Sequence, residues 1–481
     1  MNEERALAGF NSRTTPTPTQ LDDNGLLTLR DMRLLKSFAT CLLGAASWKT
    51  LWFEQQIDHS SDIGTFSQRY LLDDDQARAD GPVLFFCGNE GDIEVFANFS
   101  GFLREAATAL GAQLVFAEHR FYGQSLPFGP DFGRLQVQYL NVEQALEDYA
   151  QLIRFLVPES LRAQRPVVAF GGSYGGMLSS WMRAKYPELI FAAVASSAPV
   201  HFDRVGGSFF RMVTDAAEAV SPGCAQRVRR GFAAATSQSR QHLRAAFSLC
   251  NDDVRLDELI LWARNAFVTV AMGNYPYATN LFGQGLKAWP LKSACEQKGL
   301  NALEFLAKAV GSYYNATGGV ICHNITEEYR DCADQTGCGN LHSAWGRSWD
   351  VEACRQIVYY TSTNNVTDMF PAKEWGPRQL SQYCKQTWNI TPETFWFGPW
   401  LSKIQQSSHI IFTYGLSDPW RGGGVLNSSR RSDLVSLKIR EAGHIYDLAA
   451  SHPDDLPDVR KVRQRIIALL REWLASGEVV V

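Results

Sequence analysis

The most constraining segment of this chain is residues 171–175, Gly-Gly-Ser-Tyr-Gly, which directly follow the apolar run 166–169. Glycines two positions before and after Ser173 permit a sharp turn between a strand and a helix, since larger side chains would prevent the turn from closing. Such a turn, a nucleophile elbow, presents the Ser173 hydroxyl at the end of the strand and aims the backbone N–H of Tyr174 at a developing oxyanion. The alternative is a glycine-rich turn in which Ser173 only caps a helix.

The C-terminal part of the chain supplies an acid and a histidine in the order that such a serine requires. The apolar run 409–414 predicts a strand that leads into the loop with Asp418, and the run 434–439 predicts a strand that leads to His444. His444 would accept the serine proton, and Asp418 would orient the imidazole and stabilise its charged form. Taken singly, each could instead be an ordinary loop residue.

Apolar segments of strand length alternate with helical patterns in the first 200 residues. Strands are predicted at 67–72, 82–87, 113–118, 166–171 and 191–196, and helices at 95–110, 141–156 and 175–186. Continuous apolar strands that alternate with helices indicate a parallel sheet covered on both faces. Together with the serine turn, this pattern predicts an α/β-hydrolase fold.

The pattern changes in the middle of the chain. Helices are predicted at 226–236, 255–271 and 301–314, among irregular loops rich in Trp, Tyr and Asn. We therefore expect one α/β-hydrolase domain in two parts, 48–200 and 401–481, interrupted by a mostly helical cap at 201–400. Such a cap would cover the end of the sheet where ligands bind in this architecture.

The N-terminus has the pattern of an export signal. A polar segment, residues 1–31, precedes Met32, and residues 32–47 form a basic start, a short apolar core and a small-residue exit, as in a secretory signal peptide. We interpret 1–31 as an extension upstream of the natural start at Met32. The alternative is a short amphipathic helix of the folded domain.

Cysteines and glycosylation sequons also favour the secretory pathway, with a lysosomal, vacuolar or extracellular destination. Eight cysteines cluster in the predicted cap, at Cys224, Cys250, Cys295, Cys322, Cys332, Cys338, Cys354 and Cys384. Sequons occur at Asn98, Asn315, Asn324, Asn365 and Asn427 and, next to a proline, at Asn389. Cys87, on a predicted core strand, is expected to be a buried free thiol.

Composition and spacing exclude several other classes. The formal net charge is −4, and no basic patch suggests nucleic-acid binding. No apolar stretch reaches the roughly 18 residues of a membrane span. No Cys-x-x-Cys pair or histidine spacing indicates a metal site, and no cofactor is implied.

Two loops near the predicted sheet edge carry further polar residues. Gly88, Asn89 and Glu90 follow the strand 82–87, where the second oxyanion donor of this fold usually lies, although a plain glycine-rich turn is the alternative. The next strand ends in Glu118-His119-Arg120. There we expect a structural Arg–Glu pair, because a histidine before the serine is in the wrong order for the triad.

Several separated segments together resemble one family. They are residues 88–92, 116–123, 125–129, 171–177, 418–420 and 422–424. From about residue 52 to the end, the chain resembles the prolyl-specific serine peptidases, the family of dipeptidyl peptidase II and lysosomal Pro-X carboxypeptidase. The resemblance implies an α/β-hydrolase domain with a helical, disulfide-bonded cap, an acidic lysosomal or secreted setting, cleavage after proline and, as an option, a homodimer.

Details of the resemblance favour the dipeptidyl peptidase II branch. Residues 332–339, Cys-Ala-Asp-Gln-Thr-Gly-Cys-Gly, are similar to its cap, where the aspartate matching Asp334 is placed to bind the substrate α-amine; Glu90 is a second candidate. The resemblance also implies the pairs Cys224–Cys295, Cys250–Cys322, Cys332–Cys338 and Cys354–Cys384. The family usually has two adjacent histidines at the catalytic loop, and here Ile445 replaces the second.

We therefore expect a serine exopeptidase that releases X-Pro, and also X-Ala, dipeptides from peptides with a free N-terminus. The expected machinery is the triad Ser173, Asp418 and His444. Pro-X carboxypeptidase activity on the same triad, lipase or esterase activity, and a non-catalytic binding role are the alternatives. The carboxypeptidase would need a cation, not a carboxylate, at the far end of the cleft.

Overall fold

The computed structural model describes residues 48–281, 285–337, 344–394, 396–429 and 433–476. Within residues 48–481 the chain forms one compact unit. The predicted N-terminal extension 1–31 and signal segment 32–47 lie outside the described residues, so both remain predictions.

An eight-stranded sheet runs through the described part of the chain, in the order β1-β2-β4-β3-β5-β6-β7-β8. Its strands are β1 (Lys49–Gln56), β2 (Thr65–Asp73), β3 (Val83–Cys87), β4 (Gln113–Ala117), β5 (Val167–Gly172), β6 (Ile190–Ser196), β7 (Ile410–Gly415) and β8 (Leu434–Ile439). The pairs β1–β2 and β2–β4 are antiparallel, and every pair from β4–β3 to β7–β8 is parallel. This is the predicted α/β-hydrolase fold, with β1 as an edge strand that the sequence pattern did not predict.

Helices cover both faces of the sheet. Those outside the segment between β6 and β7 are α2 (Ile93–Phe99), α3 (Gly101–Leu110), α4 (Val142–Leu156), α5 (Tyr174–Lys185) and α16 (Pro457–Ser476), with short 3-10 turns at Val137–Tyr139, Glu159–Leu161, Pro419–Gly423 and Tyr446–Leu448. The prediction of one helix over 95–110 is wrong, because the helix is interrupted at Ser100. There Gly101 begins a new helix so close to Ala450 that an added Cβ would lie 2.5 Å from the alanine Cβ.

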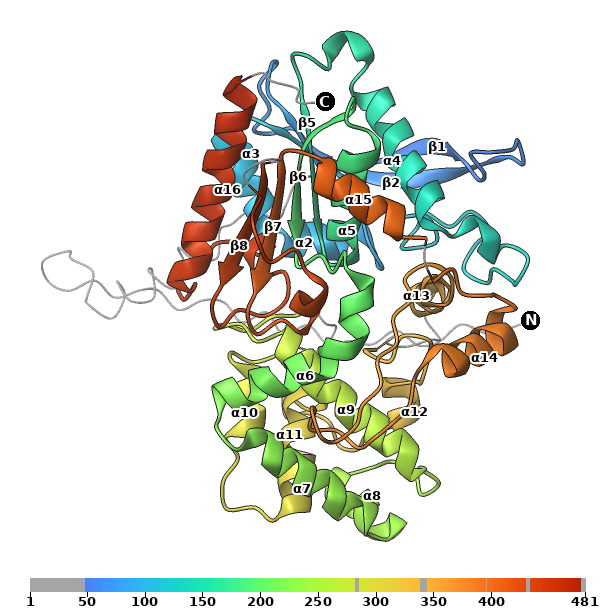
Figure 1. Cartoon of the computed structure of the whole chain (residues 1–481), viewed down its shortest axis with the longest axis vertical. Helices are drawn as coiled ribbons and strands as arrows, with labels where there is room; N and C mark the ends of the chain where they lie inside the picture. Colours follow the sequence, from blue (N-terminus) through green and yellow to red (C-terminus); the bar gives the residue numbers. More distant parts are fainter. Residues whose placement is uncertain (1–47, 282–284, 338–343, 395, 430–432, 477–481) are drawn as a thin grey trace, which may run out of the picture. The chain divides into compact units, whose positions relative to one another are not determined.

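Alternate residues of the central strands point into two separate cores. In β3, Phe85 packs in the core that includes α4 and α5, and its ring meets that of Tyr149 edge-on at 5.7 Å. Its neighbours Leu84 and Phe86 pack in the second core, with residues of α3 and α16. These two helices lie side by side next to the sheet in Figure 1. All five side chains of β3 are buried, which explains its unbroken apolar sequence.

The segment between β6 and β7 is mostly helical, as predicted for the cap (Figure 1). Its helices are α6 (Phe202–Val220), α7 (Cys224–Thr236), α8 (Arg240–Phe247), α9 (Leu256–Met272), α10 (Pro290–Cys295), α11 (Ala302–Tyr314), α12 (Ile325–Glu328), α13 (Ala344–Arg355), α14 (Pro377–Trp388) and α15 (Gly398–Gln406). Just before α15, Trp396 packs on Trp181 of α5 with ring centroids 5.2 Å apart. The cap segment is thus joined to the hydrolase part by packing, and the boundaries 48–200, 201–400 and 401–481 remain predictions.

Disulfides cross-link the cap helices. The pairs Cys224–Cys295, Cys250–Cys322 and Cys354–Cys384 are present, as predicted. Cys338 lies outside the described residues, so its pairing with Cys332 remains a prediction. Cys87 is buried and free, also as predicted, and burial raises the pKa of its thiol.

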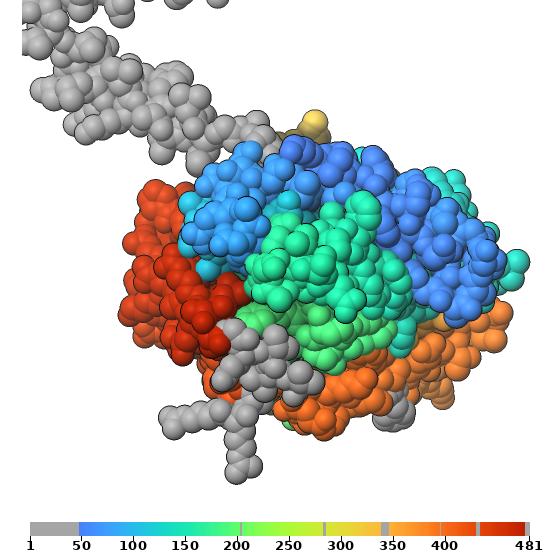
Figure 2. Space-filling view, turned by 90° about the horizontal axis from the view of Figure 1, so that it is seen from above, coloured from blue at the N-terminus to red at the C-terminus, as the bar shows by residue number. Residues whose placement is uncertain are grey.

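The surface opposite the cap is built from the two segments that flank it. Figure 2 looks onto this end and shows mainly residues before about 190 and after about 390.

The predicted glycosylation sites differ in exposure. Asn98, Asn365, Asn389 and Asn427 are exposed, whereas Asn315 and Asn324 are half-buried. Glycosylation at any of these positions remains a prediction.

Candidate active site

Ser173 lies at a strained turn between β5 and α5. Its backbone has φ 58° and ψ −124°, a conformation that non-glycine residues rarely adopt. A Cβ on Gly171 would lie only 2.0 Å from the carbonyl oxygen of Gly175. The end of β5 and the start of α5 can therefore approach this closely only with glycine at position 171. The N–H of Ser173 donates to the carbonyl oxygen of Ser196 (2.8 Å). The predicted nucleophile elbow therefore has the geometry that its sequence indicates.

Asp418 and His444 form a buried hydrogen-bonded pair. Oδ2 of Asp418 lies 2.9 Å from Nδ1 of His444, and the residues are 0% and 4% exposed. The carboxylate accepts the Nδ1 hydrogen, which leaves Nε2 of the neutral ring as a proton acceptor. The other carboxylate oxygen of Asp418 accepts from the N–H of Trp420 (3.0 Å), so the acid is held in place from both sides.

Contacts of Ile445 bring the histidine loop onto the serine turn. Its N–H donates to the hydroxyl of Ser197 (2.9 Å). A Cβ on Gly172 would lie 2.9 Å from Cγ2 of Ile445. The residue after His444 thus packs on the residue before Ser173, and the structure places the three predicted catalytic residues at one edge of the sheet.

The cap also holds the histidine loop. The N–H of His444 donates to the carbonyl oxygen of Met272 (2.8 Å), at the C-terminal end of α9. The hydroxyl of Tyr275 donates to the carbonyl oxygen of His444. Both backbone groups of the histidine are therefore fixed by the segment between β6 and β7, an arrangement that no sequence motif signals.

The turns that carry the candidate oxyanion donors are in contact. Tyr174 is the first residue of α5, so helix geometry leaves its N–H without an intrahelical acceptor. A Cβ on Gly175 would lie 3.3 Å from Cβ of Asn89, which shows that the loop after β3 packs on the elbow. The N–H of Gly88 already donates to the carbonyl oxygen of Ala117 (2.9 Å). Gly88 is thus engaged in the sheet, and Asn89 is the remaining candidate for the second donor.

Glu90, on the loop after β3, has an unsatisfied side-chain oxygen. Its side chain is half-buried, and Oε2 is buried with no hydrogen-bond partner among the described residues. Burial raises the pKa of Glu90; the charge of His444 opposes this shift and the charge of Asp334 adds to it. Glu90 therefore interacts electrostatically with both His444, the predicted catalytic histidine, and Asp334, the predicted amine-binding residue.

Asp334, in contrast, has its hydrogen-bonding capacity filled by the protein. One oxygen accepts from the N–H (2.8 Å) and the hydroxyl (2.6 Å) of Thr336. The other accepts from Nε1 of Trp349 (2.9 Å) and the hydroxyl of Tyr359 (3.1 Å). A carboxylate accepts about four hydrogen bonds, so these donors account for the whole group.

The loop residues Glu118 and Arg120 are structural, as predicted, but they do not pair with each other. Glu118 pairs with Arg69 (2.6 Å), and Arg120 pairs with Asp148 (2.5 Å), all within the buried interior. The sequence could not show these partners because each lies on a separate strand or helix. Together the pairs hold the loop after β4 beside the elbow.

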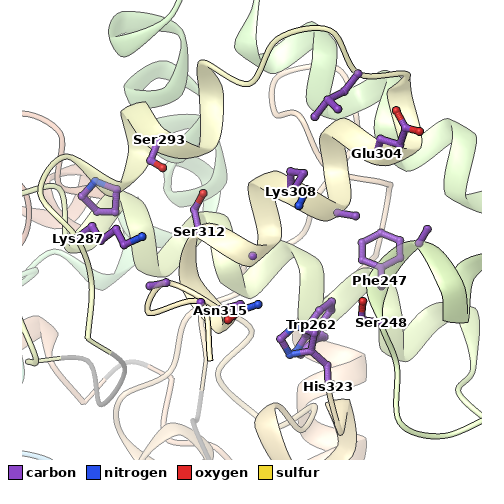
Figure 3. Close-up of a pocket in the computed structure, with 17 residues that line it drawn as sticks. Phe247, Ser248, Trp262, Lys287, Ser293, Glu304, Lys308, Ser312, Asn315 and His323 are labelled. Atoms are coloured by element: carbon purple, nitrogen blue, oxygen red, sulfur yellow. The ribbon is translucent and has the colours of Figure 1, made fainter. Parts of the chain in front are cut away.

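A further hollow lies in the cap and does not include the triad. It has a volume of about 620 Å³ and is lined by residues such as Phe247, Trp262, Lys308 and Asn315 (Figure 3).

Among the described residues, no group of three or more His, Cys, Asp or Glu side chains is arranged to hold a metal ion. In the same part of the chain, no helix is both long and apolar enough for a membrane crossing.

A strained serine at a strand end and a buried Asp–His pair at the same sheet edge define a serine hydrolase of the α/β-hydrolase fold. Comparison with known families is more specific. The model of the family described as "Serine carboxypeptidase S28" matches residues 55–466, and the chain belongs to this family. The predicted family is thereby confirmed, and the protein is a serine-type peptidase.

Known relatives span nearly the whole chain. Lysosomal Pro-X carboxypeptidase of Homo sapiens is 36% identical over 454 residues, which cover 89% of this chain and 89% of the relative. Thymus-specific serine protease of Mus musculus is 29% identical over 465 residues, which cover 88% and 87%. Among solved structures, a proline iminopeptidase from Mycobacterium smegmatis aligns with a TM-score of 0.39 at 9% identity, over 89% of this chain and 100% of that chain.

Proposed function

We propose that this peptidase is a dipeptidyl peptidase that releases X-Pro, and also X-Ala, dipeptides from the free N-terminus of peptides. The observation that carries the proposal is the buried Oε2 of Glu90, which has no hydrogen-bond partner among the described residues. The charges of His444 and Asp334 both act on this carboxyl group. A protonated substrate α-amine would supply the missing donor as a charge-assisted hydrogen bond. With its N-terminus held by this anchor, a substrate would present only a peptide bond close to that terminus to Ser173.

The surroundings of Glu90 support an ammonium and not a carboxylate as the substrate terminus. The charges of Glu90 and Asp334 act on each other. Two neighbouring carboxylates attract a cation and repel an anion. A carboxypeptidase would need the opposite charge to bind the terminal carboxylate of its substrate.

Within this proposal the two predicted amine-binding residues have different roles. Glu90 makes the direct contact, because one of its oxygens is free to accept. Asp334 acts through its charge alone, since its four donors already fill its capacity. Its negative charge still favours an ammonium nearby.

The chemistry follows from the geometry of the triad. The hydroxyl oxygen of Ser173 attacks the carbonyl carbon of the proline residue while Nε2 of His444 takes the hydroxyl proton. The backbone N–H groups of Tyr174 and Asn89 stabilise the oxyanion. The charged imidazole then donates its proton to the leaving amine, and the X-Pro acyl group stays on Ser173. Water, activated by the same histidine, releases the dipeptide. The cycle uses no cofactor or metal.

A paired assay at acidic pH tests the proposal. One substrate is Lys-Pro with a free N-terminus and a fluorogenic leaving group, and the other is an N-blocked peptide that ends in Pro-Phe. Release from the first alone, lost in Ser173→Ala, supports the dipeptidyl peptidase. Cleavage of the second alone would overturn it in favour of Pro-X carboxypeptidase activity, which the names of relatives such as the human protein favour. Turnover of a simple ester without either peptide would indicate an esterase.

We also propose an exported setting, in the lysosome, the vacuole or the extracellular space. The cap disulfides among the described residues require an oxidising compartment to form. The name of the human relative, lysosomal Pro-X carboxypeptidase, supports the same setting. The proposal includes glycans at the exposed sequons, which the mass of the secreted protein before and after deglycosylation would measure. It also includes a homodimer, which light scattering would measure.

A further inference from the structure

Four buried polar side chains form a hydrogen-bonded network behind the elbow. The hydroxyl of Tyr174 lies 2.9 Å from Oε1 of Glu352 and 3.2 Å from Nε2 of His119. The hydroxyl of Tyr122 lies 2.5 Å from the second oxygen, Oε2, of Glu352. Each of the four residues is at most 2% exposed. Glu352 comes from cap helix α13, whereas the other three belong to the hydrolase part.

The hydrogen atoms of this network can be counted. Nδ1 of His119 lies 2.7 Å from the carbonyl oxygen of Arg120, so Nδ1 carries the hydrogen and Nε2 of the neutral ring must accept one. The hydroxyl of Tyr174 has one hydrogen and two acceptors within reach. With an ionised Glu352 that hydrogen goes to the carboxylate, and the buried Nε2 is left without a donor.

One added proton satisfies every group. If Oε1 of Glu352 carries a hydrogen, it donates to the hydroxyl oxygen of Tyr174, and Tyr174 donates to Nε2 of His119. Tyr122 donates to Oε2 of Glu352. Each donor then has one acceptor, as buried polar groups require.

The same proton could instead sit on His119, but that arrangement places two charges in the interior. Nε2 of His119 and Oε1 of Glu352 are 3.7 Å apart, too far for a direct hydrogen bond. Burial lowers the pKa of His119 to about 4 and raises the pKa of Glu352 to about 8. Both directions favour the neutral arrangement.

We propose that Glu352 is a positioning residue whose neutral carboxylic acid donates a hydrogen bond to the hydroxyl of Tyr174. Tyr174 directly follows the nucleophile, and its backbone N–H is the predicted oxyanion donor. Holding its side chain from the cap fixes the first turn of α5 at the serine. The inference rests on serine hydrolase chemistry and not on which end of a peptide the protein binds.

The groups around Glu352 determine how it responds to pH. Tyr122 and Tyr174 donate to or accept from it, and the negative charge of Glu90, on the loop after β3, also raises its pKa. His119 in turn feels Arg120 and Asp148, whose charges oppose each other. Above about pH 8 the carboxyl loses its proton, the donor to Tyr174 disappears, and a second negative charge faces Glu90.

The test measures the rate at which a fluorophosphonate acylates Ser173, because this reaction needs the oxyanion donors but no peptide terminus. Glu352→Gln keeps an N–H donor and a C=O acceptor of the same shape, without a titrating proton. We expect it to react within about threefold of the wild type at pH 6 and to keep its rate at pH 9, where the wild type loses most of its own. Glu352→Ala should lose about tenfold or more at both pH values.

Two further variants make the result decisive. Glu147→Gln is the matched control, because Glu147 also accepts from a tyrosine hydroxyl, that of Tyr186 (2.6 Å), but lies outside the network. It should leave the pH profile unchanged. Tyr174→Phe keeps the backbone N–H and should resemble Glu352→Ala. The proposal is overturned if Glu352→Gln declines with the wild type at alkaline pH, or if it is as slow as Glu352→Ala while its thermal unfolding is normal.

Discussion

The backbone N–H of His444 donates a hydrogen bond to the carbonyl oxygen of Met272 (2.8 Å), which joins the catalytic loop to the end of cap helix α9. The cap is therefore part of the framework that holds His444, the proposed catalytic base. A change in the cap that moves the end of α9 will also move His444, even where it does not touch a substrate.

Gly443 makes this relationship testable. A Cβ at this position would lie 2.1 Å from the carbonyl oxygen of Met272, so Gly443→Ala must push the loop away from α9. We expect kcat to fall by about tenfold to hundredfold, because small displacements of a catalytic group are costly. Steady-state kinetics with the preferred peptide measures the effect.

The matched control is Gly311→Ala. An added Cβ at Gly311, on α11, has no neighbour within 4 Å. This variant should keep kcat and gain about 0.5–1 kcal/mol in the free energy of unfolding, as alanine favours a helix over glycine. Equal kcat in both alanine variants would show that the contact with Met272 does not position the histidine.

Asp418→Asn should disable the enzyme while leaving it folded. The carboxylate accepts the Nδ1 hydrogen of His444, whereas an amide nitrogen at that place would favour the wrong tautomer. We expect kcat to fall by about 10⁴-fold with an unchanged KM. The exposed Asp433→Asn serves as the control and should behave as the wild type. A loss in Asp418→Asn of less than about tenfold would contradict the assigned triad.

The fold and the residues of the proposed triad could be found from the sequence because their signals are local. The strand β5, the elbow and the strands before Asp418 and His444 are each readable within about ten residues. β1 was not predictable in this way, because its side chains are largely exposed and its place comes from antiparallel pairing with β2. At the break between α2 and α3, Gly101 likewise packs against Ala450, far along the chain.

The supporting residues of the site could not be predicted, because their partners are remote in sequence. Glu352 is one acid in an ordinary helical pattern, and its role depends on Tyr122 and Tyr174, which lie 230 and 178 residues away. The contact of Met272 uses only a backbone carbonyl, which leaves no trace in the sequence. The resemblance pointed to Asp334, and the structure adds that its donors are already supplied by the protein.

The bridge Cys354–Cys384 should contribute to activity as well as stability. Its removal by alanine at both positions opens a loop of 30 residues, for which we expect about 3–4 kcal/mol less free energy of unfolding. Cys354 is two residues from Glu352 on α13, so kcat should fall too. Denaturant unfolding and kinetics on the same preparation measure both quantities.

The bridge Cys250–Cys322 provides the comparison. It closes a longer loop, with a sequence separation of 72, and joins cap segments that carry none of the proposed site residues. Its removal should lower the free energy of unfolding by a similar amount or more and leave kcat within about twofold. An equal loss of kcat in both variants would indicate that the whole cap has become less rigid, and not that the effect is specific to α13.

Glu90→Gln tests the proposed recognition of the substrate amine. Loss of a charge-assisted hydrogen bond costs about 1.5–3 kcal/mol, so KM for the free Lys-Pro substrate should rise by about 10- to 150-fold while kcat changes little. The control is Glu94→Gln, a nearby glutamate with a side chain that is 46% exposed. A KM equal to that of the wild type in Glu90→Gln would remove Glu90 from the binding site.

The pH dependence of KM gives an independent check on Glu90. Burial raises its pKa, so on acidification it takes up a proton earlier than an exposed glutamate does. Only the ionised form attracts the substrate ammonium, and therefore the KM of the wild type should rise as the pH falls through the pKa of Glu90. In Glu90→Gln this acidic rise should disappear, because the amide does not titrate. If both enzymes show the same acidic rise in KM, another group binds the amine.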